Sequence, residues 1–147
     1  MKQFLTSCFV GMTCTLLLAG GTVSETQYTS VPVKVTISWT SDTNGVADGV
    51  TSFVRGEIKR VVIDPDGSSA PTASYDITLK DESGFDVLAG LGADLSATAS
   101  ISIVPFYSTV IGAQTNFYRY TINDVLTLAV TNAGSEASGT VVLYLKK

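Results

Sequence analysis

Residues 33–40 have the sequence VKVTISWT, in which apolar and polar side chains alternate without interruption. Successive side chains of a β-strand point to opposite faces of a sheet, so this period of two predicts a strand with one face buried in a core. The strand is expected to end at residues 41–45, because Asn44 and Gly45 supply the positive φ that a tight turn requires. This stretch favours β structure as the basis of the fold.

The same alternation recurs along the chain. We predict strands over residues 53–63 with a bulge at Gly56, and over 75–80, 100–106, 117–122, 125–131 and 141–145. Residues 85–95 and 107–116 are expected to be irregular connections, residues 123–124 a turn, and the last two strands a hairpin. About seven or eight short strands separated by turn signals predict an all-β fold, an antiparallel β-sandwich of Ig-like or jelly-roll-like type.

The N-terminal residues 1–24 are typical of a signal peptide. Lys2 is followed by a charge-free run over residues 4–19, and small residues follow near a plausible cleavage point at residues 21–24. The run is shorter and more polar than the ~20 apolar residues of a membrane span, so no stable membrane span is predicted. Residues 25–31 are expected to be a polar linker, and residues 32–147 a single β-sandwich domain.

The cysteines both fall within this first segment. Its cleavage would remove Cys8 and Cys14, and the mature chain would then contain no thiol, disulfide or zinc site. If the segment is retained, we expect it to form a buried or oligomer-forming helix.

Composition argues against catalysis. The 147 residues include no histidine, which excludes the Ser-His-Asp and Cys-His nucleophile systems and histidine metal sites. The acidic pairs Asp81–Glu82 and Asp64–Asp66 fall in predicted turns, where carboxylates more often accept local backbone hydrogen bonds than act on a substrate or bind Ca²⁺. We therefore expect no enzymatic activity, cofactor or metal.

The charge distribution argues against nucleic-acid binding. The formal net charge is −4, and the basic residues are scattered singly or in short pairs. A nucleic-acid surface needs a continuous basic patch to contact the phosphates, so no direct contact with nucleic acid is expected.

Aromatic residues gather in the C-terminal half of the chain. Tyr and Phe are enriched in the cores of protein interfaces, which makes Phe117, Tyr118, Tyr120 and Tyr144 candidate protein-contact residues. On alternating strands about half of such residues would instead belong to the ordinary core, and both interpretations remain open.

Segments of the chain resemble small β-sandwich proteins of tailed-bacteriophage structural modules. The resemblance rests on residues 75–88 (YDITLKDESGFDVL) with the glycine-rich loop that follows, and on residues 126–134 (LTLAVTNAG) closing on residues 139–145 (GTVVLYL). It implies a non-enzymatic virion structural protein, a decoration, neck or tail-associated subunit. Such a subunit would assemble as a homo-oligomer with other virion proteins of the capsid or tail.

The signal-like N-terminus supports an alternative function. An exported bacterial β-sandwich domain, periplasmic, secreted or at the cell surface, would bind carbohydrate or protein there. The two hypotheses predict different locations, virion or exported, for the same fold.

Overall fold

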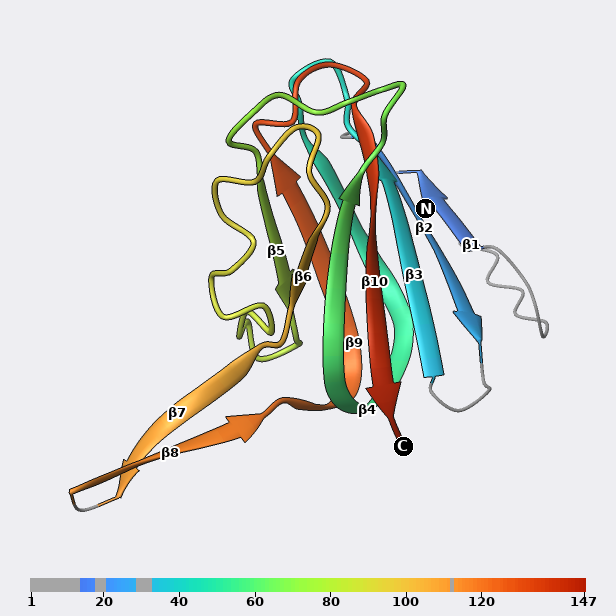
Figure 1. The fold of residues 1–147 in the computed structure, drawn as a ribbon. Helices are drawn as coiled ribbons and strands as arrows, with labels where there is room; N and C mark the ends of the chain where they lie inside the picture. Colours follow the sequence, from blue (N-terminus) through green and yellow to red (C-terminus); the bar gives the residue numbers. More distant parts are fainter. Residues whose placement is uncertain (1–13, 18–20, 29–32, 112) are drawn as a thin grey trace.

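The computed structural model describes residues 14–17, 21–28, 33–111 and 113–147, which form an antiparallel β-sandwich (Figure 1). Its strands are β1 (Cys14–Leu17), β2 (Thr22–Tyr28), β3 (Val33–Thr40), β4 (Ala47–Pro65), β5 (Asp76–Lys80), β6 (Ile101–Ile103), β7 (Phe106–Ile111), β8 (Gln114–Arg119), β9 (Thr121–Thr131) and β10 (Ser138–Lys146). The predicted fold class is confirmed, with more strands than the sequence indicated.

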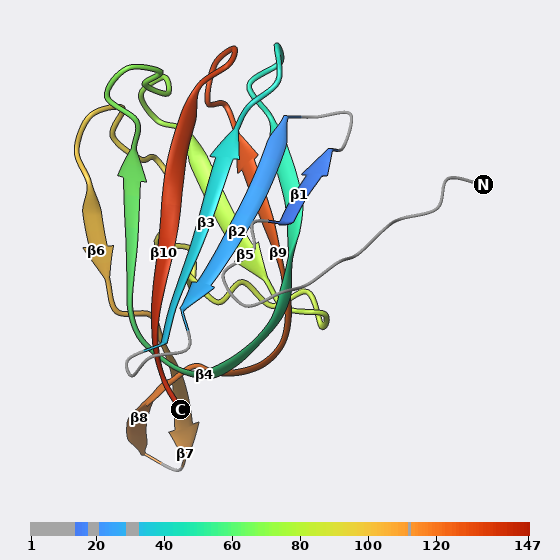
Figure 2. The same ribbon diagram turned by 90° about the vertical axis from the view of Figure 1, so that its right-hand side faces the viewer.

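Strand β4 belongs to both layers of the sandwich. The hydrogen-bonded order is β1-β2-β3-β10-β4-β9-β5, with β6 also paired to β4. The first part of β4 pairs with β9 and the last part with β10, and Glu57 is the residue at which one partner replaces the other. Figures 1 and 2 show β4 running down one layer, bending at the lower end and returning up the other. One long strand thus joins the two layers.

The irregularities of β4 differ from the predicted bulge at Gly56. Its register shifts between Val50 and Phe53, and again opposite the step from Tyr144 to Leu145, whereas Gly56 pairs regularly with Ile122. Gly56 is nevertheless special, because its φ of 143° lies in a region that L side chains rarely adopt. Gly56 therefore permits the bend of β4 and does not form a bulge.

The core lies between the two layers and follows the period of two. On β3 every second residue is buried, namely Val33, Val35, Ile37 and Trp39. Strands β5, β9 and β10 bury alternate residues in the same way. The Trp39 and Tyr75 rings meet at a centroid distance of 5.8 Å across this interior. Each large apolar side chain so buried stabilises the fold by roughly 1.5–3 kcal/mol.

The expected linker at residues 25–31 is wrong for residues 25–28, which lie in β2. The side chain of Val23 is only 4% exposed, and that of Glu25 is also buried. Polar residues misled the prediction, because Thr22–Thr26 still alternate between half-buried and buried positions. Residues 29–31 lie outside the described part of the chain.

The signal-like segment is described only in part. Cys14–Leu17 forms β1, which pairs with β2, and it is not the helix expected of a retained segment. Residues 22–24 belong to β2. Removal of residues 1–24 stays a prediction.

Three further expectations are wrong in the C-terminal half. The connection expected at 107–116 forms most of β7 and β8, and β9 runs without interruption through the turn expected at 123–124. The last two strands do not form a hairpin, because β4 lies between β9 and β10. Instead the loop over residues 132–137 crosses from one layer to the other.

Candidate protein-contact hairpin

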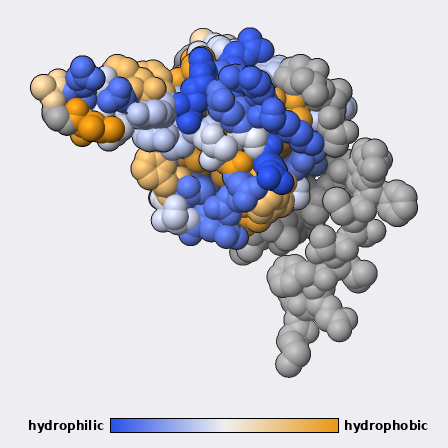
Figure 3. Space-filling view, turned by 90° about the horizontal axis from the view of Figure 1, so that it is seen from below, coloured by the Kyte–Doolittle hydropathy of each residue, from blue (hydrophilic) through white to orange (hydrophobic). Residues whose placement is uncertain are grey.

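The β7–β8 hairpin projects from the lower end of the sandwich (Figures 1 and 3). Its strands are antiparallel, with opposed residues running from Phe106 and Arg119 at the base to Ile111 and Gln114 near the tip. Among the described residues these two strands pair only with each other. Because an isolated two-stranded hairpin is marginally stable in water, contacts at its base or with another molecule must help to hold it.

One face of the hairpin, here called the Phe117 face, carries Phe106, Ser108, Val110, Thr115 and Phe117, with Arg119 at its base. Opposed and alternate residues of an antiparallel pair share a face, which fixes this set from the register. The Phe106 and Phe117 rings meet edge to face at 5.3 Å. Phe117 is 65% exposed and Val110 is 68% exposed, so the contact leaves most of this apolar surface in solvent.

The opposite face, here called the Tyr118 face, carries Tyr107, Thr109, Ile111, Asn116 and Tyr118. The Tyr107 and Tyr118 rings stack across the strands, 5.4 Å apart with their planes 24° from parallel. Ile111, near the tip, is 65% exposed. Both faces of the projecting hairpin therefore present apolar side chains to solvent. Figure 3 shows orange patches on the side of the arm that is seen from below.

Tyr120 connects the hairpin to the sandwich. Its ring lies 5.3 Å from Tyr107 and 5.3 Å from Phe85, so aromatic contacts run from the hairpin to the loop after β5. Its backbone oxygen accepts a hydrogen bond from the Ile58 N–H at 2.8 Å. Burial, followed by the nearby charges of Asp86 and Asp81, raises the pKa of the Tyr120 hydroxyl, which stays protonated at neutral pH.

Charged groups also meet at the base. The Lys59 ammonium lies 2.6 Å from Glu57 Oε1, and Arg119 Nε lies 3.7 Å from the same oxygen. Arg119 Nη1 donates to the Lys59 carbonyl oxygen at 3.3 Å. The hydrogen bond from Lys59 and the charges of Lys59 and Arg119 lower the pKa of the Glu57 carboxyl. Such exposed pairs contribute little stability, and their main effect here is to orient the hairpin on β4.

The structure brings together three of the four candidate contact residues. Phe117 and Tyr118 lie on opposite faces of the hairpin, and Tyr120 is half-buried at its base. Tyr144 lies apart, on the outward side of β10, where the Arg60 guanidinium sits 4.4 Å from the centre of its ring. The candidate surface is therefore the hairpin, without Tyr144.

Sequence reasoning missed the aliphatic part of this surface. Val110 and Ile111 were assigned to a connection, because residues 106–111 (FYSTVI) carry apolar and polar side chains in pairs and lack the single alternation of β3. Phe85 was assigned to a loop, and only the fold brings it to Tyr120. The available signal for β7 was its content of aromatic and β-branched residues. No local signal existed for Phe85.

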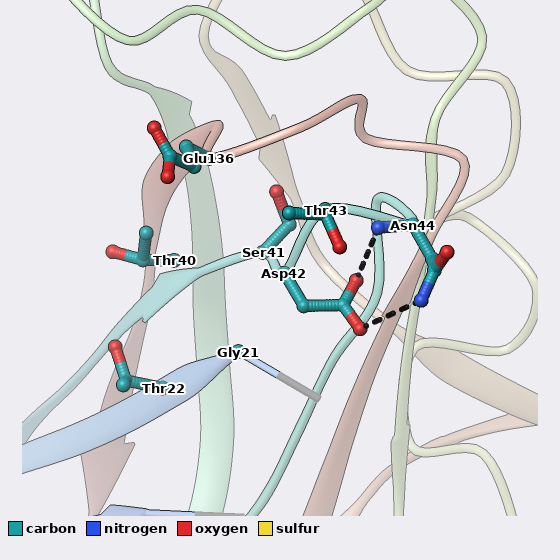
Figure 4. A pocket seen from close by; sticks show the side chains of 8 residues that line it. All are labelled: Gly21, Thr22, Thr40, Ser41, Asp42, Thr43, Asn44 and Glu136. Carbon is teal, nitrogen blue, oxygen red and sulfur yellow. Dashed lines mark hydrogen bonds between the residues drawn. The ribbon is translucent and has the colours of Figure 1, made fainter. Parts of the chain in front are cut away.

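A polar depression lies at the opposite end of the sandwich (Figure 4). It encloses ≈ 600 Å³ and is lined by Gly21, Thr22, Thr40, Ser41, Asp42, Thr43, Asn44 and Glu136. The Asp42 carboxylate already accepts hydrogen bonds from the Asn44 and Val46 N–H groups, at 2.8 and 3.0 Å. These bonds, that from Val46 foremost, lower the pKa of Asp42. The Asp42 carboxylate thus stabilises the turn in which it lies.

Asp66 and Asp81 act in the same local way, as predicted. Asp66 accepts from the Ser68 and Ser69 N–H groups at 2.7 and 2.8 Å, and Asp81 accepts from the Phe85 N–H at 2.9 Å. Asp64 instead lies in β4 and accepts a hydrogen bond from the Ser100 hydroxyl, and Glu82 lies beside Asp124. Within the described ranges, no three His, Cys, Asp or Glu side chains gather closely enough to hold a metal ion.

Neither membrane-span analysis nor comparison with known proteins points to a function for this chain. No segment that the structure describes forms a helix with the length and apolar character needed to cross a membrane. Neither the protein-family models, nor the curated proteins, nor the solved structures gave a significant match to this chain.

Proposed function

We propose that this chain is a non-enzymatic structural subunit of a virion, a decoration, neck or tail-associated protein, and that it acts by docking onto other proteins through the β7–β8 hairpin. The observation that carries the proposal is the exposure of apolar side chains on both faces of that projecting hairpin.

The amount of exposed apolar surface supports a protein interface. The exposed residues are Phe106 (49%), Tyr107 (41%), Val110 (68%), Ile111 (65%), Phe117 (65%) and Tyr118 (42%). With about 200 Å² for each aromatic side chain when fully exposed, the four aromatic residues alone present about 400 Å², divided between the two faces. The largest apolar patch of a typical monomer is roughly 300–600 Å² and is often functional. We therefore infer that a partner protein covers the apolar side chains of the hairpin.

The virion as the place of action rests on the resemblance to phage sandwich proteins in residues 75–88 and 126–145. The fold is compatible with that function, because a rigid sandwich can present a projecting arm to its neighbours in a particle. The exported domain that binds carbohydrate or protein remains the alternative.

The test is incorporation into particles. Particles from a culture that encodes the chain are banded in a density gradient, and the chain is detected in the particle fraction. Phe117→Ser should reduce its incorporation about tenfold or more, because an exposed aromatic anchor in an interface contributes 2 kcal/mol or more.

The matched control is Phe53→Ser. Phe53 is 56% exposed but lies on β4, away from the hairpin, and its substitution should leave incorporation unchanged. Thermal unfolding of both variants should remain close to that of the wild type. A wild-type chain that stays out of the particle fraction would refute the proposal, and saturable binding of the free chain to glycans would favour the alternative.

A further inference from the structure

We propose that the occupant of the Phe117 face is a second copy of this chain, so that two hairpins pack across a two-fold axis close to Ser108. The inference rests on the proposed function of the hairpin as a protein-contact surface and names its immediate partner.

The first argument is the low charge of this surface, whose one charged residue is Arg119 at the base. No Asp, Glu, Lys or Arg occurs between Asp94 and Arg119, in a chain whose formal net charge is −4. Two copies of an acidic chain repel each other least when they meet at a surface without like charges. The Arg119 guanidinium, at the edge of the Phe117 face, is directed back toward Glu57 and the Lys59 carbonyl oxygen.

The second argument is the arrangement of side chains on the face. Phe106, Val110 and Phe117 surround the small hydroxyl residue Ser108, which lies directly opposite Phe117 in the hairpin register. In a two-fold interface the same patch occurs on both sides, so it must complement itself. A face with apolar residues around a small polar centre meets that requirement.

The third argument is size. The exposed fractions of Phe106 and Phe117 correspond to about 230 Å² of aromatic surface per copy, or about 460 Å² for two. Val110, the backbone and the Ser108 and Thr115 side chains add to this, and the contact has the small size of weak or transient interfaces, below about 1,200 Å². Packing of two hairpins also replaces two marginal pairs of strands by a four-stranded unit.

A lipid surface suits the hairpin less well. Both outer edges of the β7–β8 pair lack a strand partner within the described residues, and unpaired backbone groups are strongly unfavourable in hydrocarbon. A protein surface can satisfy or hydrate these groups.

The experiment measures the oligomeric state of the purified full chain by sedimentation velocity over a range of concentrations. The wild type should form a dimer. Ser108→Asp and Ser108→Lys should each weaken dimerisation by about a hundredfold, because like charges then face each other across the axis. An equimolar mixture of the two variants should restore a dimer that contains one copy of each.

Ser135→Asp is the matched control, because Ser135 is exposed in the loop between β9 and β10, far from the hairpin in sequence. It should dimerise as the wild type does. A wild type that is monomeric at all concentrations, or a Ser108→Asp variant that dimerises as strongly as the wild type, would overturn the inference. Flotation of the wild type with phosphatidylcholine vesicles would overturn it in favour of a lipid surface.

The two proposals fail in different ways. A monomeric chain that still enters particles through Phe117 would refute self-association and keep the structural function. A dimer that never enters particles would do the reverse.

Discussion

At the scale of single residues, side chains repair the hydrogen bonding that the β4 irregularity interrupts. Between Val50 and Phe53 the β4–β9 register shifts. The Thr51 hydroxyl oxygen there accepts a hydrogen bond from the Leu126 N–H at 2.9 Å, in a buried setting. The Ser52 N–H donates to the Glu25 carboxylate at 2.5 Å. Two polar side chains thus take the place of ladder partners.

Replacement of Thr51 tests this role. In Thr51→Val the shape of the side chain is kept, but the buried Leu126 N–H loses its acceptor. We expect the free energy of unfolding to fall by about 1–3 kcal/mol, the usual cost of an unsatisfied buried donor. Urea denaturation followed by circular dichroism measures it.

The matched control is Thr127→Val, on an exposed position of β9. It should change the free energy of unfolding by no more than about 0.5 kcal/mol. Equal effects of the two substitutions would show that the Thr51 hydroxyl has no such role.

At the scale of elements, the sequence predicted which residues share a face better than it predicted which strands pair. Alternation identified β3, β5 and β10, because burial of one face leaves a period of two in the residues themselves. The pairing of β9 with β4, and not with β10, depends on a loop that passes from one layer to the other, and no local sequence pattern indicates that path. The candidate site divides in the same way, since Phe117 and Tyr118 were found by residue type whereas Phe85 is brought to Tyr120 only by the fold.

Strand β2, which lies between β1 and β3, shows how a strand can escape a hydropathy pattern. Its buried positions include Glu25, although a sequence pattern places a glutamate at the solvent-exposed surface. The side chain of Val23 fills the space above Gly49, where an added Cβ would lie 2.3 Å from the Val23 Cβ. β2 is therefore packed closely on β4.

This packing predicts how much of the N-terminus the sandwich tolerates losing. A chain that begins at Thr22 keeps β2 complete and should unfold at nearly the same urea concentration as the full chain. A chain that begins at residue 29 loses Val23 and Glu25 and should be less stable by about 3 kcal/mol or more, from lost apolar burial and hydrogen bonds. Urea denaturation of both chains measures the difference.

The same argument limits any removal of the signal-like segment. Intact-mass measurement of the purified protein should then place its first residue no later than Thr22. An N-terminus at Glu25 or beyond, in a protein as stable as the full chain, would contradict the role given to β2.

At the scale of the whole molecule, β4 makes the two layers one cooperative unit. Its first part is hydrogen-bonded to β9 in one layer and its last part to β10 in the other. If β4 detaches, β9 loses its partner in one layer and β10 loses its partner in the other. We therefore expect a single unfolding transition, of the kind that small single domains usually show.

Gly56, one residue before the change of partner at Glu57, is the point at which this coupling can be tested. A Cβ there would lie 2.8 Å from the Lys146 carbonyl oxygen, and the φ of 143° is strained for any other residue. Gly56→Ala should lower the free energy of unfolding by about 3 kcal/mol. Hydrogen exchange should then accelerate together in β9 and β10, because both depend on the same strand. Gly67→Ala, at a position with open space around the added methyl group, should leave both strands protected. Faster exchange in only one layer of the Gly56→Ala variant would show that the layers unfold separately.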